Sequence, residues 1–180
     1  MKFIIILSFI ALVTCTYYNS KERSAFFGNQ IAPVYGLLND PEMDIERYGH
    51  LILEEVIKTK PDVYYRIVAL LLESDRIDLS KLNTADLLIS AAEKGHVSVL
   101  RILLNDDRFD PSANDNSALR SSVERGQYGS VFSLMRDGRC KPDVSMLKQA
   151  VANKNFGIIE DLLLDRELLS YYVEKSYHLF

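Results

Sequence analysis

The 180-residue sequence contains two cysteines, five prolines, eight glycines and no tryptophan. Two cysteines, Cys15 and Cys140, cannot build a disulfide framework, and the lack of CxxC motifs and Cys/His clusters argues against a zinc site. The glycines are scattered, so there is no glycine-rich phosphate loop. With 21 basic residues against 25 acidic ones and a net charge of −4, the chain lacks the basic surplus of nucleic-acid-binding proteins. We therefore expect no nucleic-acid partner, and we expect Cys140 to be a small hydrophobic residue at a loop edge.

The remaining composition is that of a folded protein with a real core. Hydrophobic residues make up 48% of the chain and charged residues 26%. These fractions are close to the averages for folded soluble domains and far from those of disordered or collagen-like chains. The length allows one domain or a small array of repeats.

The most apolar stretch of the sequence lies at its N-terminus. Lys2 is followed by an apolar run over 3–13 and then by Thr14 and Cys15. This order is typical of a secretory signal peptide, and the run is shorter than the ~20 apolar residues that cross a bilayer. A buried helix and lipidation of Cys15 are the alternatives. Cleavage would place the protein in the secretory pathway, whereas an uncleaved chain would stay in the cytoplasm, and neither form has a stable membrane span.

Similar segments recur along the chain at offsets between 28 and 34. The recurring pairs are 37–44 with 71–78, 71–78 with 103–110, 91–104 with 122–135, and 119–135 with 147–163. At an offset of 31, Gly95 aligns with Gly126, and Asp106 and Arg108 align with Asp137 and Arg139. A recurrence of this kind is the signature of a repeat architecture.

Each recurring unit is predicted to form two short helices and a polar loop. Apolar residues share one face of a first helix over 88–94 and one face of a second helix around 99–104. Gly95 ends the first helix, because glycine adopts the left-handed conformation at low cost. Asp110-Pro111-Ser112 supplies turn residues at the end of the unit. Neither helix could bury its apolar face alone, so we expect neighbouring units to stack as a solenoid.

These residues resemble ankyrin repeats. Residues 95–104, Gly-His-Val-Ser-Val-Leu-Arg-Ile-Leu-Leu, are similar to the second helix of that family, and 107–119 is similar to the loop of a divergent subset. Ser117-Ala118-Leu119-Arg120 stands where standard repeats have Thr-Pro-Leu-His. The resemblance implies an all-α fold, an α-solenoid of stacked helix-turn-helix repeats joined by short loops or rudimentary hairpins.

The resemblance also suggests how the chain is divided. We expect a signal peptide or apolar helix over 1–15, a repeat array over 16–168 and a C-terminal cap over 169–180. The predicted units are approximately 17–44, 45–80, 85–112, 117–143 and 145–168. The tyrosine-rich end is expected to form a helix that covers the last unit, and an aromatic docking segment for a partner is the alternative.

No set of titratable residues has the spacing of a catalytic or metal site. The histidines His50, His96 and His178 are not paired with another His or Cys at i+3 or i+4. The adjacent carboxylates Glu54-Glu55 and Asp106-Asp107 do not face one another on a helix, and the loop after Asp106 lacks the glycine and glutamate of a calcium site. We therefore predict no catalytic, cofactor-binding or metal-binding residues.

The resemblance implies a non-enzymatic module for protein–protein interaction, acting as a monomer. A secreted or exported effector of the same kind is the alternative, and an enzyme with an unrecognised site is a further one. Members of the family bind partners on the face formed by loop tips and first helices. Carried over by position, the partner-binding residues are Lys81, Asn83, Asp86, Asn114, Asp115, Asn116, Ser117, Arg120, Ser121, Asp143, Ser145, Lys148 and Gln149.

Overall fold

The computed structural model describes residues 45–59, 65–74 and 77–177. Within these ranges the regular structure consists of nine α-helices and one short 3-10 helix, without strands. The all-α prediction is confirmed for this part of the chain. The predicted signal peptide over 1–15 and the predicted first unit over 17–44 lie outside the described residues.

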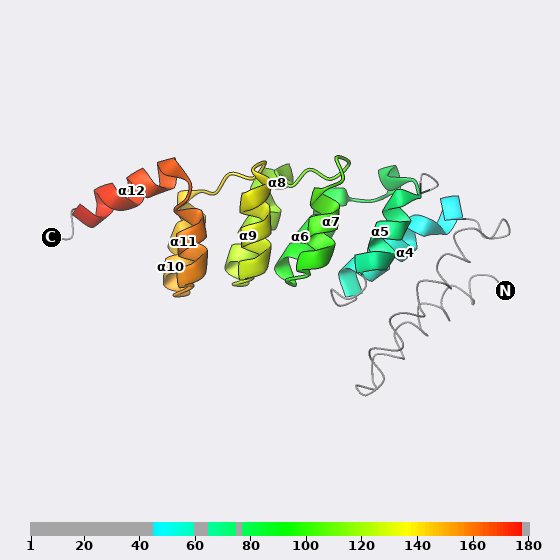
Figure 1. Ribbon diagram of the computed structural model, residues 1–180, viewed down its shortest axis with the longest axis horizontal. Helices are drawn as coiled ribbons and strands as arrows, with labels where there is room; N and C mark the ends of the chain where they lie inside the picture. The colour runs from blue at the N-terminus through cyan, green and yellow to red at the C-terminus, as the bar shows by residue number, and fades with distance from the viewer. Residues whose placement is uncertain (1–44, 60–64, 75–76, 178–180) are drawn as a thin grey trace, which may run out of the picture.

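Eight of the α-helices form four consecutive pairs, which stand side by side in a row (Figure 1). The pairs are α4 (Ile45–Thr59) with α5 (Tyr65–Glu73), α6 (Thr84–Glu93) with α7 (Val97–Leu104), α8 (Ala113–Glu124) with α9 (Tyr128–Asp137), and α10 (Val144–Ala152) with α11 (Phe156–Leu162). The 3-10 helix η3 (Leu79–Lys81) precedes α6, and α12 (Arg166–Tyr177) follows α11.

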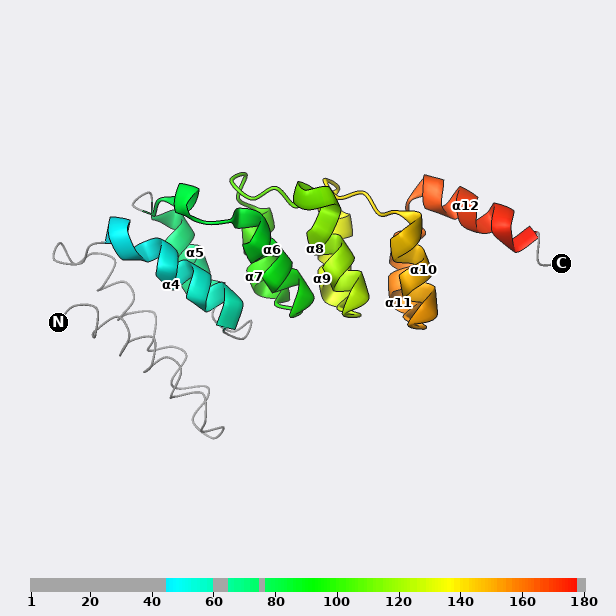
Figure 2. The same cartoon turned by 180° about the vertical axis from the view of Figure 1, so that it is seen from behind.

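The row has two layers. The first helices of the pairs, α4, α6, α8 and α10, contact one another in that order, and α5, α7, α9 and α11 do the same in the other layer. Figure 1 shows the second helices in front, and Figure 2 shows the first helices in front after a half turn. The turns within the α6–α7, α8–α9 and α10–α11 pairs lie at one edge of the row, and the α7–α8 and α9–α10 connections lie at the other (Figure 1).

The core runs continuously between the layers. Leu88, Leu100, Leu119 and Leu134 are fully buried, as the apolar stripes predict, and Leu162 continues the same core in α11. Each such side chain stabilises the fold by about 1.5–3 kcal/mol relative to an exposed position. Because every helix contributes one stripe to this shared core, the described helices are stabilised by their neighbours more than by their own sequence.

The turns within pairs repeat one backbone geometry. Gly95 and Gly126 have φ of 71° and 67°, and Lys154 takes the same position in the α10–α11 turn with a φ of 56°. A Cβ atom on Gly95 would lie 2.5 Å from Gln127 Oε1, and one on Gly126 would lie 3.0 Å from Asn155 Nδ2. Each glycine therefore provides both the left-handed backbone and the room for the next unit to approach.

The first turn of α8 is left-handed, where the resemblance allowed a short loop or a rudimentary hairpin. Asn114, Asp115 and Asn116 have φ of 53°, 58° and 57°. Asn and Asp tolerate this conformation better than other residues with side chains. Leu119 follows Pro111 by eight residues, whereas Leu147 follows Pro142 by five. The left-handed turn accounts for these three extra residues, and thus for the change of the repeat offset from 31 to 28.

Candidate partner-binding surface

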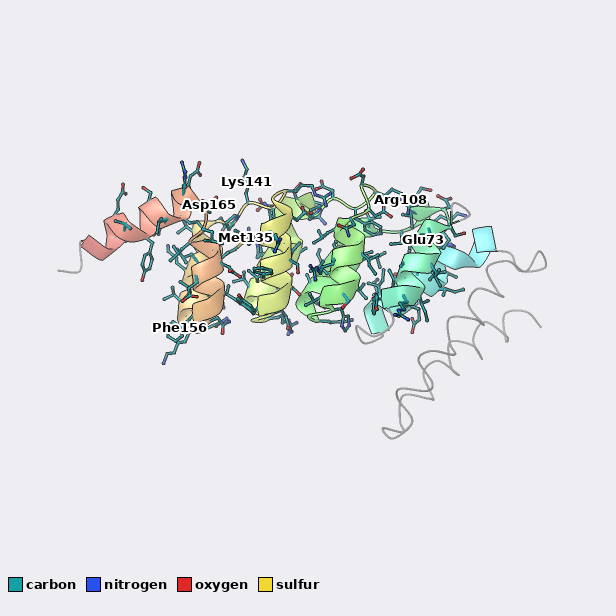
Figure 3. The ribbon with its side chains drawn as sticks, in the orientation of Figure 1. Glu73, Arg108, Met135, Lys141, Phe156 and Asp165 are labelled. Carbon is teal, nitrogen blue, oxygen red and sulfur yellow. The ribbon has the colours of Figure 1, made fainter. Side chains whose placement is uncertain are left out.

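The predicted partner-binding residues occupy the first helices and the loops that precede them. Three groups are distinguished by their position: Lys81, Asn83 and Asp86 at η3 and the start of α6; Asn114, Asp115, Asn116, Ser117, Arg120 and Ser121 in α8; and Asp143, Ser145, Lys148 and Gln149 at α10. Figure 3 shows the loop edge of the row, where Arg108, Lys141 and Asp165 lie, and the opposite edge, where Phe156 lies.

Arg120 joins the α8 and α10 groups into one polar cluster. Its Nη2 atom lies 2.7 Å from Asp143 Oδ2 and 3.3 Å from Asp115 Oδ2, and its Nη1 atom donates to Ser145 Oγ at 2.8 Å. Ser145 Oγ donates in turn to Asp143 Oδ1 at 2.6 Å. We call these four residues the Arg120 cluster. It connects two neighbouring units through side chains that are 23 to 25 positions apart in the sequence.

Within the Arg120 cluster, Asp143 has a strongly lowered pKa. It caps the N-terminus of α10, where its Oδ1 atom accepts from the Met146 amide at 2.9 Å. Burial alone would raise the pKa of Asp143, but hydrogen bonds from Ser145, the Met146 amide and Arg120 outweigh burial and lower this pKa to about 2. The carboxylate is therefore fully charged at neutral pH and fixes the position of Arg120.

The left-handed turn is also tied to the next unit. Asn116 Oδ1 accepts from the Lys141 amide at 3.0 Å, and Ser117 Oγ donates to the Asn114 carbonyl. The first of these bonds connects the left-handed turn at the start of α8 to the loop before α10. The structure thus brings most of the predicted α8 and α10 residues into one ordered surface.

The remaining predicted residues have contacts within their own segments. Lys81 Nζ lies 3.6 Å from Asp78 Oδ2, and Asn83 caps α6 by accepting from the Asp86 amide at 3.3 Å. In α10, Gln149 Nε2 donates to Asn153 Oδ1 at 3.4 Å. Lys148 is exposed and Ser121 is half-buried. These residues lie on the predicted surface but are not part of the Arg120 cluster.

Two arginines that the prediction omitted connect successive units. Arg108 Nη2 lies 2.6 Å from Asp106 Oδ2 and donates to the Leu72 carbonyl at 2.8 Å. One unit later, Arg139 Nε lies 2.7 Å from Asp137 Oδ1, and Arg139 Nη2 donates to the Leu104 carbonyl at 2.6 Å. We call each Asp-x-Arg arrangement an arginine clamp. In both clamps the aspartate orients the guanidinium and the arginine reaches the end of a helix in the preceding unit.

The electrostatics of the clamps follow from these contacts. Hydrogen bonds from Arg108 and Arg139 lower the pKa of Asp106 and Asp137, respectively, and the bond to Asp137 raises the pKa of Arg139. The sequence already contains the pattern that marks the clamps, because Asp-x-Arg recurs at an offset of 31. Its role was not predictable, since the acceptors are backbone carbonyls that lie 36 and 35 positions earlier in the sequence.

Cys140 has the packing role that was expected. Its side chain is buried, and Sγ donates to the Pro111 carbonyl at 3.2 Å. Burial raises the pKa of the thiol to about 12, which opposes formation of a reactive thiolate. In the part of the chain that the structure describes, no three His, Cys, Asp or Glu residues gather as metal ligands, and no helix has the length and apolar character to span a membrane.

Comparisons with known proteins returned no matching family model, no similar curated protein and no similar solved structure. The functional interpretation is therefore built from the repeat pattern, the paired helices and the Arg120 cluster.

Proposed function

We propose that the chain is an ankyrin-type solenoid that binds a protein partner through its first helices and loops and catalyses no reaction. The sequence repeat with offsets between 28 and 34, the glycine turns within pairs and the stacked pairs support the ankyrin-type assignment. Repeat arrays use their long lateral surfaces for binding. The loop side of this row is such a surface, and it carries the ordered polar groups described above.

The Arg120 cluster is the single observation that carries this proposal. The three charged side chains differ in exposure, with Arg120 at 31%, Asp143 at 42% and Asp115 at 89%. Hydrogen bonds fix the first two before any partner arrives, so binding costs little additional side-chain entropy there. Exposed Asp115 remains accessible on the same surface.

The charges of the cluster favour a basic group on the partner. Two carboxylates surround one guanidinium, which leaves one net negative charge at this point of the surface. A lysine or arginine of the partner would complement that charge, and Asp115 is the carboxylate best exposed to receive it. We therefore propose that the partner presents a basic side chain to the start of α8.

Capture from the source cells, followed by a binding measurement, tests this function. The immobilised chain is compared with the variant D115N/R120A/K148A, and the captured protein is then purified for titration. Asp115 is changed to asparagine and Asn114 is left unchanged, because the left-handed backbone at both positions disfavours alanine. We expect the triple variant to bind at least tenfold more weakly, since clustered polar anchors contribute most of the binding energy.

The control variant is R101A/F132A/R136A, which removes exposed side chains from α7 and α9 in the other layer. We expect this control to bind like the wild type. Equal binding by the wild type and D115N/R120A/K148A, or a loss confined to the control, would contradict the proposed surface.

A further inference from the structure

Three aromatic side chains are exposed on the second layer of the row, where α9 and α11 lie. Tyr128, Phe132 and Phe156 are 52%, 42% and 71% exposed. The rings of Tyr128 and Phe132 are stacked, with 6.3 Å between their centroids and 28° between their planes. Figure 3 shows Phe156 at the edge that holds the turns within pairs. Exposed apolar side chains that lie together mark interaction sites, whereas single ones need no explanation.

Tyr128 joins these rings across two helices. A Cβ atom on Gly157 would lie 3.1 Å from both Cδ2 and Cε2 of Tyr128, so the ring of Tyr128 lies against the backbone of α11. Phe156 is the residue before Gly157 in that helix. Tyr128 therefore contacts both Phe132 and the first turn of α11, which carries Phe156. We call Tyr128, Phe132 and Phe156 the aromatic patch.

Packing between units does not require these rings. At the joint between α7 and α9, Val97 has the position that Tyr128 has at the next joint, and a Cβ atom on Gly129 would lie 2.8 Å from Val97 Cγ2. Val97 is half-buried, so a small aliphatic side chain fills that joint. Arg101 has the position of Phe132, at an offset of 31. The aromatic patch thus exposes apolar area that the preceding unit does without.

Cations border the aromatic patch. Arg101 lies in α7, which contacts α9, and Arg136 follows Phe132 by one helical turn. Arg125 and Lys154 lie in the turns that lead into α9 and α11. All four cations are exposed, and none of them forms an ion pair within the described residues. Their charges are therefore available to carboxylates of another molecule.

We propose that the aromatic patch binds an acidic peptide segment of a second protein partner. Apolar side chains of the segment pack on the rings, and its carboxylates pair with Arg101 and Arg136. Four exposed cations against two exposed acids, Glu124 and Glu160, give this area a positive surplus, although the whole chain has a net charge of −4. An acidic segment complements that surplus.

The two exposed acids favour a peptide over an anionic membrane surface. Glu160 has the position of Phe132 in α11, at an offset of 28, and Glu124 precedes Arg125. A membrane with anionic lipids presents negative charge across its whole surface and would meet these carboxylates together with the cations. A peptide segment places its carboxylates opposite the arginines and avoids the acids.

The aromatic patch and the Arg120 cluster lie on opposite layers. Helices α9 and α11 are in front in Figure 1, whereas α8 and α10 are in front in Figure 2. One molecule can therefore hold an acidic segment on its second layer while the basic partner proposed above occupies the first. The chain would then bring two proteins of opposite charge together.

Selection from a phage-displayed library of random peptides tests the proposal. The library is first depleted on immobilised R101A/F132A/R136A, which removes peptides that bind elsewhere on the chain, and is then selected on the wild type. We expect the enriched peptides to combine acidic residues with aromatic residues or leucine. One enriched peptide is synthesised for titration, together with a copy in which amides replace its carboxylates. The amide copy should bind about tenfold more weakly.

Variants of the full chain locate the binding site of the selected peptide. Y128V/F132A removes two rings and keeps the joint filled as Val97 fills it, whereas R101A/R136A removes two charges. Each should weaken binding about tenfold. The matched control is D115N/R120A/K148A on the first layer, which should bind the peptide like the wild type. Circular dichroism verifies folding, and F132A/F156A replaces Y128V/F132A if the latter does not fold.

Several outcomes would overturn the proposal: no enrichment, enrichment of peptides without acidic residues, or wild-type affinity in both Y128V/F132A and R101A/R136A. Vesicles of anionic phospholipid that bind through the aromatic patch when no peptide is enriched would assign the patch to a membrane instead. The basic partner is titrated separately and should still bind R101A/F132A/R136A, so failure of this proposal is distinguishable from failure of the proposed function.

Discussion

Asp143 caps the N-terminus of α10 and also holds Arg120, and the second of these roles depends on its negative charge. The pKa of its carboxyl group is lowered to about 2, against burial, by hydrogen bonds from Ser145, the Met146 amide and Arg120. The ordinary pKa of an unfolded aspartate is about 3.9. Since the folded value is the lower one, the carboxylate stabilises the fold above about pH 4, and this contribution is lost as the pH falls towards 2.

The variant D143N isolates this charge, because asparagine caps a helix nearly as well as aspartate does. We expect D143N to lower the free energy of unfolding at pH 7 by at most about 1 kcal/mol, since the side chain is 42% exposed. The difference between wild type and variant should shrink as the pH decreases from 4 towards 2. Urea unfolding at several pH values measures it. A difference that stays constant over this range would show that the ion pair with Arg120 does not contribute.

The role of a single residue could be predicted from the sequence where that residue acts on its own backbone. Gly95 was expected to end a helix and has a φ of 71°. The contact between Arg120 and Asp143 could not be derived, because it depends on how two units stack across 23 residues. Lys154 stands where the other turns have glycine, yet its φ of 56° preserves the turn. A lysine in that conformation is uncommon, so this turn could not be predicted from the residue type.

At the scale of secondary-structure elements, the arginine clamps supply hydrogen-bond donors to carbonyls at the C-terminal ends of helices. The last four carbonyls of a helix have no partner within it. Leu72 lies in the last turn of α5 and Leu104 is the last residue of α7, and their carbonyls accept from Arg108 and Arg139. The cation is also favourable at the negative end of the helix dipole. Each clamp therefore completes one helix while attaching it to the following unit.

Removal of one clamp should destabilise the row without affecting secondary structure elsewhere. We expect R139M to lower the free energy of unfolding by about 1–2 kcal/mol, because hydrogen bonds from a charged donor are lost and the Leu104 carbonyl keeps only water as a partner. R136M is the control, since Arg136 in the last turn of α9 is exposed and its replacement should cost less than about 0.5 kcal/mol. Urea unfolding compares the two, and equal losses would argue against the clamp.

The helices were predictable because their apolar residues recur with helical spacing and glycines separate them. The left-handed turn was not predictable in detail. Asn114-Asp115-Asn116 indicates a turn, but the same residues suit several turn types, and the resemblance allowed either a short loop or a rudimentary hairpin. The C-terminal helix was placed at 169–180, whereas α12 begins at Arg166. Asp165 determines this start, because it accepts from the Glu167 and Leu168 amides at 3.0 and 3.1 Å.

At the scale of the whole molecule, the joints between units are not equivalent. The arginine of the two clamps corresponds to Glu167 at the third joint, at an offset of 28 from Arg139. Asp165 still accepts from the amide two residues later, as Asp106 and Asp137 do. The loop geometry is thus retained but the cation is missing. This difference agrees with the departure of α12 from the stack, which Figure 1 shows.

The variant E167R should supply the missing clamp. By equivalence with Leu104, the acceptor would be the Met135 carbonyl, and Asp165 would orient the new guanidinium. We expect slower hydrogen exchange of the α12 amides, by about fivefold, corresponding to about 1 kcal/mol. E160R in α11 makes the same change of charge and should leave exchange in α12 unaltered; comparable protection by both variants would refute the clamp.

The left-handed turn over 114–116 has a consequence for how such a chain can change in length. At the opposite edge, Gly95 lies close to the next unit, where an added Cβ atom would lie 2.5 Å from Gln127 Oε1. The loop edge accommodates three additional residues beside an unchanged pair of helices. Insertions acquired in evolution, or an epitope grafted between Ser112 and Ser117, would accordingly be displayed on the surface while the spacing of the stack is preserved.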